Sequence, residues 1–148
     1  MNNERSNAWR VFFRVQGHVN SILEATLKAR LGLTLSDYHV LLALWEAEEH
    51  TLRMGQLADM VVFSPSRVSY LVTHLEKDGL VKRQPSSWDK RGFDATLTPE
   101  GERRFLVATR IHQELIREVV LADMGEEQIN ELVDLFARIE EQMNASDY

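Results

Sequence analysis

Hydroxyl, tyrosine and basic side chains gather between Ser64 and Lys77, where apolar residues recur at helical spacing. A helix of this kind buries its apolar side and presents its polar side to solvent. An arginine can donate two parallel hydrogen bonds to guanine O6 and N7, and hydroxyl groups can bond phosphates or base edges. The helix is therefore a candidate for entry into the major groove of DNA. Its candidate contact residues are Ser64, Ser66, Arg67, Ser69, Tyr70, Thr73 and His74.

A second group of charged residues follows in a predicted hairpin. Arg91 is the main candidate there, because a guanidinium fits the narrow, electronegative minor groove of A-tract DNA. Asp89 lies two positions before it and can hold that side chain or a neighbouring basic residue. Lys82, Arg83 and Lys90 suit either support of the hairpin base or phosphate contacts, which position a protein on DNA without reading its sequence. Trp88 either packs on the base of the hairpin or touches the sugar–phosphate backbone.

Local signals define the elements that would position these groups. Ser64 can cap the polar helix, Pro65 suits its first position, and Gly79 can end it in the left-handed conformation. Strands are expected at residues 80–83 and 93–97, joined by the charged tip. Further helices are expected over residues 7–31, 36–49 (capped by Ser36), 55–62, 98–120 and 126–143, with a short third strand at 51–53. Thr98 and Pro99 can start the helix over 98–120 in the same way as Ser64 and Pro65.

Five motifs in this order resemble the multiple antibiotic resistance regulator (MarR) family of bacterial transcription factors. They are Gly55–Asp59 before the polar helix, Ser64–Leu75 as the recognition helix, the Leu75–Val81 junction, the wing signature Asp89-Lys90-Arg91, and Leu97–Gly101. The resemblance spans nearly the whole chain. It implies a mostly α fold with a small β-wing, in which a winged helix-turn-helix carries N- and C-terminal dimerisation helices. It also implies that residues 89–91 form the family's Asp-x-Arg arrangement.

Apolar stripes on the outer helices predict a homodimer. A helix with one apolar face must bury it, and a winged module alone has little surface to cover three long helices. The resemblance implies one unit over residues 1–148, with dimerisation helices at 7–31 and 98–143 around a DNA-binding part at 33–97. The alternative is that the stripes pack within one chain. The predicted interface residues are Phe12, Ile129, Val133, Phe136, Ile139 and Met143.

Aromatic and basic residues near the first two helices suit a cleft for a small aromatic or phenolic effector. Such ligands need an apolar cavity with a few convergent polar groups. Family members often bind aromatic acids between the dimer helices and the winged part. The same residues could equally be ordinary core. The candidates are Trp9, Phe13, Arg14, His18, Tyr38 and Trp45.

Charge is distributed unevenly along the 148 residues, whose formal net charge is −6. The segment 53–98 carries seven basic and five acidic residues, whereas 123–148 carries one basic and eight acidic residues. Local charge governs phosphate affinity, so the acidic C-terminus does not exclude DNA as a partner. We expect neither a membrane span nor a secretory signal, and therefore a cytoplasmic location.

The residue types argue against catalysis and bound cofactors. The chain has no cysteine, and its sequence contains neither a glycine-rich phosphate loop nor an HExxH pair. Spacing alone does not exclude Glu24, His39 and His112 as metal ligands, but no HExxH pair or His/Cys cluster is present, and we expect no metal.

Together these features predict a dimeric regulator that binds a pseudo-palindromic double-stranded operator. The resemblance implies repression of nearby genes, relieved by an effector. A winged-helix interaction module that does not bind DNA and a small-molecule-binding protein or enzyme remain the alternatives.

Overall fold

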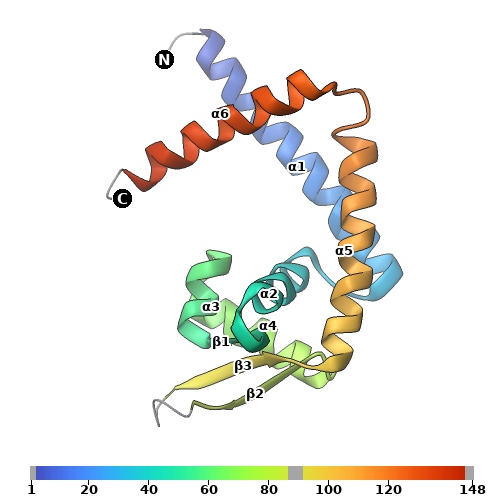
Figure 1. The fold of residues 1–148 in the computed structure, drawn as a ribbon, viewed down its shortest axis with the longest axis vertical. Helices are drawn as coiled ribbons and strands as arrows, with labels where there is room; N and C mark the ends of the chain where they lie inside the picture. The colour runs from blue at the N-terminus through green and yellow to red at the C-terminus, as the bar shows by residue number, and fades with distance from the viewer. Residues whose placement is uncertain (1–2, 87–91, 146–148) are drawn as a thin grey trace. The chain divides into compact units, whose positions relative to one another are not determined.

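A computed structural model describes residues 3–86 and 92–145, and Figure 1 shows its elements. The chain forms two compact units, Met1–Gln113 and Glu114–Tyr148. Long helices dominate, and the described strands form one small antiparallel sheet. The predicted fold class, mostly α with a small β-wing, is therefore confirmed. Among the described residues, no helix is both long and apolar enough to cross a bilayer.

The first unit contains the helix-turn-helix and the sheet. Its elements are α1 (Asn3–Leu31), α2 (Leu35–Glu46), η1 (Glu48–His50), β1 (Thr51–Arg53), α3 (Met54–Val61), α4 (Pro65–Lys77), β2 (Val81–Pro85) and β3 (Phe93–Leu97). Helix α5 (Pro99–Val119) begins in this unit and ends in the second, which also holds α6 (Glu126–Asn144).

The sheet has the strand order β1-β3-β2, and both pairings are antiparallel. Thr51 lies opposite Thr96, and their hydroxyl oxygens are 2.9 Å apart. Val81 lies opposite Leu97 at the base of the hairpin. The short strand predicted at residues 51–53 is therefore confirmed as the third strand, and it pairs with β3.

A shared apolar core fixes α4 against α2 and α3. Val68, Leu71, Val72 and Leu75 form the buried face of α4, as the spacing predicted. Buried leucines from the neighbouring helices join this core: Leu41, Leu44 and Leu57. Figure 1 shows α2, α3 and α4 gathered beside the sheet, from which the hairpin of β2 and β3 extends.

Hydroxyl caps mark the starts of α4 and α5. The Ser64 hydroxyl accepts a hydrogen bond from the Arg67 amide at 3.3 Å, and the Thr98 hydroxyl accepts one from the Gly101 amide at 3.0 Å. Gly79 has a φ of +72°, which confirms its place after α4. The hydroxyl caps of α4 and α5 are thus both as predicted.

The second helix differs from its prediction at both ends. Thr34, rather than Ser36, is the N-cap, because its hydroxyl bonds the Asp37 amide while the Asp37 carboxylate bonds the Thr34 amide. The helix ends at Glu46, and Glu49 takes a φ of 51°, which an α-helix cannot continue through. The first helix also begins earlier than predicted, at Asn3.

Gly101 marks a close approach between α5 and the end of the α4–β2 turn. A Cβ added there would overlap the carbonyl oxygen of Leu80. The same carbonyl accepts a hydrogen bond from the Thr98 amide at 3.0 Å. Only glycine lets the first turn of α5 lie this close to Leu80.

The backbone conformation of Val62 leads to a prediction about stability. Val62 lies between α3 and α4 in the left-handed region, with a φ of 55°. A β-branched residue is strained there, and the side chain is 87% exposed, so its removal forfeits little burial. Val62→Gly should raise the free energy of unfolding by about 1 kcal/mol, measured by urea denaturation. The control Val61→Gly, inside α3, should lower it. A Val62→Gly variant less stable than wild type would contradict the strain.

Candidate nucleic-acid interface

Helix α4 presents a polar stripe opposite its buried face. Ser66, Tyr70, Thr73 and Lys77 are all exposed and lie at positions i, i+4, i+7 and i+11, which align along one side of a helix. Tyr70 projects into solvent, with 71% of its surface exposed. The apolar core on the other side fixes the rotation of α4, so this stripe faces away from the protein.

Several of the predicted contact residues also bond within α4. The Ser64 and Ser66 hydroxyls are 3.2 Å apart. The Thr73 hydroxyl donates to the carbonyl of the half-buried Ser69 at 2.8 Å, which leaves its oxygen able to accept a further bond. His74 Nδ1 lies 3.7 Å from an oxygen of Asp78. Their contact with DNA stays a prediction.

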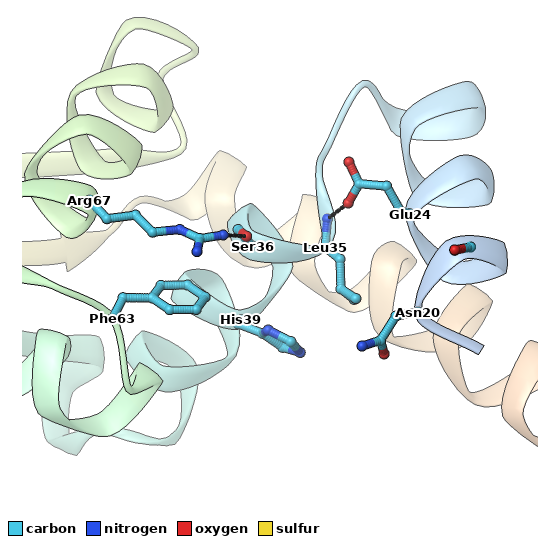
Figure 2. A pocket seen from close by; sticks show the side chains of 8 residues that line it. Asn20, Glu24, Leu35, Ser36, His39, Phe63 and Arg67 are labelled. Atoms are coloured by element: carbon cyan, nitrogen blue, oxygen red, sulfur yellow. Dashed lines mark hydrogen bonds between the residues drawn. The ribbon is translucent and has the colours of Figure 1, made fainter. Parts of the chain in front are cut away.

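Arg67 lies on a different side of α4 and contacts α2 (Figure 2). Its Nη2 atom donates to the Ser36 hydroxyl at 2.8 Å, and its guanidinium carbon lies 4.1 Å from the centre of the Phe63 ring. The side chain is nevertheless exposed to solvent. The residue predicted to read guanine thus engages two groups of its own chain.

The described part of the hairpin carries two of the residues predicted for phosphate contact or hairpin support, Lys82 and Arg83. Lys82 is exposed on β2, opposite Thr96. Beside it, the Arg83 guanidinium lies 4.4 Å from the ring centre of Phe93, and the Arg83 amide donates to Glu76 at 3.1 Å. The bond to Glu76 ties β2 to α4, whereas the contact with Phe93 joins β2 to β3 within the hairpin. Four residues singled out at the tip lie outside the described residues: Trp88, Asp89, Lys90 and Arg91.

The residues predicted for effector binding occupy different environments. Tyr38 is buried and stacks on His112, with ring centres 4.9 Å apart. Trp45 is half-buried and stacks on His50 at 4.8 Å. The other four candidates precede these two in the chain and are exposed on α1: Trp9, Phe13, Arg14 and His18. Effector binding by this set stays a prediction.

A cavity of about 410 Å³ lies elsewhere in the first unit, beside Arg67 (Figure 2). Its lining comes from α1, α2, the turn before α4, and α4 itself. None of the six predicted effector residues lines it. The lining residues are Asn20, Ser21, Glu24, Leu35, Ser36, His39, Phe63 and Arg67. A guanidinium, an imidazole and an aromatic ring thus face one hollow.

His39 and His112 are both partly buried, which disfavours their charged forms. Burial lowers the pKa of His39, and burial together with the charge of His39 lowers the pKa of His112. Glu24 is the third residue that could ligate a metal by residue type. Its carboxylate accepts a hydrogen bond from the Leu35 amide at 2.6 Å. Within the described ranges, no group of three or more histidine or acidic side chains could hold a metal ion.

The residues predicted for the dimer interface are exposed on the single chain. Helix α6 has no buried residue, although it carries an apolar stripe. Phe12 lies on α1 and the other five on α6, and all six are exposed: Phe12, Ile129, Val133, Phe136, Ile139 and Met143. Their part in dimerisation stays a prediction.

Sequence reasoning missed three residues of this surface. Ser36 was assigned to a cap, although its hydroxyl binds Arg67 from 31 positions away. Phe63 supplies the ring under the same guanidinium. Lys77 extends the exposed stripe, and its spacing from Ser66, Tyr70 and Thr73 was the signal that could have identified it. No comparable local pattern pairs Ser36 with Arg67.

Residues 33–93 match the sequence model of the MarR family. The chain is 33% identical over 88 residues to the HTH-type transcriptional regulator PrsX of Escherichia coli, a match covering 60% of this chain and 50% of PrsX. It is 28% identical over 130 residues to the HTH-type transcriptional repressor YetL of Bacillus subtilis, covering 86% of this chain and 77% of YetL. The chain thus spans about half the length of PrsX but most of YetL.

A solved structure matches nearly the whole chain. Sco3205, a MarR family transcriptional regulator from Streptomyces coelicolor, was crystallised in complex with DNA. It is 29% identical to this chain, with a TM-score of 0.88, and the match covers 96% of this chain and 89% of Sco3205. The described fold therefore agrees with that of a regulator seen on DNA.

The buried histidines predict a pH-dependent stability. Because their pKa values in the folded chain lie below the usual 6.5, the unfolded chain binds protons first as the pH falls. The free energy of unfolding should therefore be greatest above about pH 7 and decrease toward pH 5. His112→Phe retains a ring beside Tyr38 but cannot be protonated, so the decrease should be shallower. Urea titrations at a series of pH values measure this, and equal slopes for both proteins would contradict it.

Proposed function

This chain belongs to the MarR family, and from that premise we propose that it is a sequence-specific transcriptional regulator that binds double-stranded DNA as a homodimer. The observation that carries the proposal is the polar stripe of α4, set opposite a buried apolar face in a helix-turn-helix. That Sco3205 was crystallised with DNA supports it. The proposed function requires no catalytic step.

Recognition would use α4 in the major groove. A major groove admits one α-helix, and two-fold symmetry would place two such helices about one turn of DNA apart. We propose that Ser66, Tyr70 and Thr73 contact phosphates or base edges, and that Lys77 contacts a phosphate. Two such helices would select a pseudo-palindromic operator.

The hairpin would add contacts beside the recognition helix. Lys82 is exposed on β2 and suits a phosphate contact. We propose that Arg91 enters the minor groove, held by Asp89, and that Lys90 contacts the phosphate backbone. Arginine and lysine contacts of this kind would make binding strongly dependent on salt.

A second copy of the chain is the proposed partner of the apolar stripe on α6. Val133 and Met143 are 61% and 67% exposed, and an uncovered apolar face of this kind marks an interaction surface. The acidic residues of α6 lie outside the segment that we propose to contact DNA. We propose that this helix dimerises rather than contacts DNA.

We propose that the regulator acts in the cytoplasm and represses genes by occupying their promoters. YetL, with which it aligns over most of both chains, is named a repressor. A small effector would relieve repression only if it bound better to a conformation that does not fit DNA. The cavity beside Arg67 offers a guanidinium and an aromatic ring, the groups that an aromatic acid requires.

The test of DNA recognition is selection of duplexes from a random pool, followed by affinity measurement at several salt concentrations. We expect one palindrome to be strongly preferred, with a steep salt dependence. Tyr70→Ala should weaken binding to it about tenfold, which corresponds to the loss of one specific contact. In Tyr70→Phe, retained affinity would assign the contact to the ring, and lost affinity to the hydroxyl. Weak binding that ignores sequence would instead favour an interaction module that does not act on operators.

The test of dimerisation introduces a charge into the stripe of α6. Val133→Asp should convert dimers into monomers, because a buried unpaired carboxylate is costly to desolvate. Light scattering at a series of protein concentrations measures the mass. Asn130→Asp, which adds the same charge off the stripe, should remain dimeric. A dimeric Val133→Asp variant would contradict the assigned interface.

A further inference from the structure

We propose that Arg67 is a positioning residue that holds the first turn of α4 against α2, and that it does not read a base. The inference rests on the proposed DNA-binding function. It departs from the prediction that this arginine bonds guanine. The side chain contacts Ser36 and Phe63 across the cavity drawn in Figure 2.

The two contacts use the guanidinium in complementary ways. Its edge donates to the Ser36 hydroxyl at 2.8 Å, whereas its face lies over the Phe63 ring at 4.1 Å. A planar guanidinium satisfies both at once, and an ammonium could not. To bond guanine through the same edge, Arg67 would have to leave Ser36.

Ser36 is a well-anchored partner for this bond. Its neighbour Leu35 donates its amide to the Glu24 carboxylate of α1 at 2.6 Å. Thr34 and Asp37 form the reciprocal cap on either side, and Asp37 is buried. The chain around Ser36 is thus held from α1 and by its own helix end, so the hydroxyl offers a fixed attachment point.

The first turn of α4 needs such an attachment. Ser64, Pro65 and Ser66 are exposed, and the first buried residue of the helix is Val68. The turn that precedes them includes Val62 in the left-handed conformation. Since Ser66 starts the polar stripe, a shift of this turn would change where the stripe meets DNA.

The two roles of Arg67 predict opposite effects for its partner. If Arg67 positions the turn, Ser36→Ala removes the attachment and weakens DNA binding. If Arg67 reads guanine through the edge that now bonds Ser36, that bond competes with DNA, so Ser36→Ala leaves the affinity unchanged or raises it. The variant changes no group on the polar stripe.

The experiment measures binding of four variants to the duplex selected by the wild-type protein. We expect Ser36→Ala and Arg67→Ala each to weaken binding about three- to tenfold, the range for one lost hydrogen bond. The double variant should be no weaker than Arg67→Ala alone, because the two residues act as one contact. Base preference should stay unchanged. Ser21→Ala is the control, since Ser21 lines the same cavity but donates to the Gly17 carbonyl.

A second measurement needs no DNA. Amide hydrogen exchange by mass spectrometry should be faster over residues 66–70 in Ser36→Ala and Arg67→Ala, but not in Ser21→Ala. If the wild-type protein prefers no duplex, the proposed function fails, and this measurement still decides whether Arg67 holds the turn. Unchanged exchange in both variants would overturn the proposal. So would Ser36→Ala binding at least as tightly as wild type, or Arg67→Ala losing preference at one base pair per half-site.

Discussion

Burial of one face of α4 is the constraint on which the rest of the site depends. Val68, Leu71, Val72 and Leu75 are locked into a core shared with α2 and α3, so the helix cannot rotate about its own axis. The packing of α4 on α2 and α3 therefore sets the direction in which the polar residues on its opposite side point. Arg67 and Ser36 add a polar attachment at the one end where this apolar packing stops. The orientation of the stripe thus comes from two kinds of interaction, one along the helix and one at its start.

Apolar and polar surfaces are also divided between the two units of the chain. The first unit buries a core and exposes hydroxyl and basic groups, whereas α6 in the second unit exposes an apolar stripe and carries many of the acidic residues. A negative net charge and DNA binding are compatible because phosphate affinity follows the charge close to the contact. Separating the two along the chain would let one region associate with protein while another approaches a polyanion, as we propose.

Local sequence signals were sufficient for most of the fold. The Ser64 and Thr98 caps, the turn at Gly79 and the spacing of the α4 apolar residues each depend on neighbours within a few positions. Ser36 was misassigned because Thr34 and Ser36 both suit a cap, and the reciprocal bond with Asp37 favours Thr34. The contact between Ser36 and Arg67 could not be predicted, because it joins distant segments and leaves no periodic pattern. The exposed stripe through Lys77, in contrast, was present in the spacing.

The junction at Gly101 couples three elements mechanically. The Thr98 hydroxyl bonds the carbonyls of Gly79 and Leu80, its amide bonds the latter again, and the first turn of α5 lies too close for any side chain. These contacts therefore prevent independent movement of three segments: the end of α4, the start of the hairpin and the first turn of α5. A tilt of α5 in this unit would therefore move α4 and the β2–β3 hairpin together as one rigid body. A change in the proposed contact with DNA would then require α4 and the hairpin to move together, and neither could be repositioned alone.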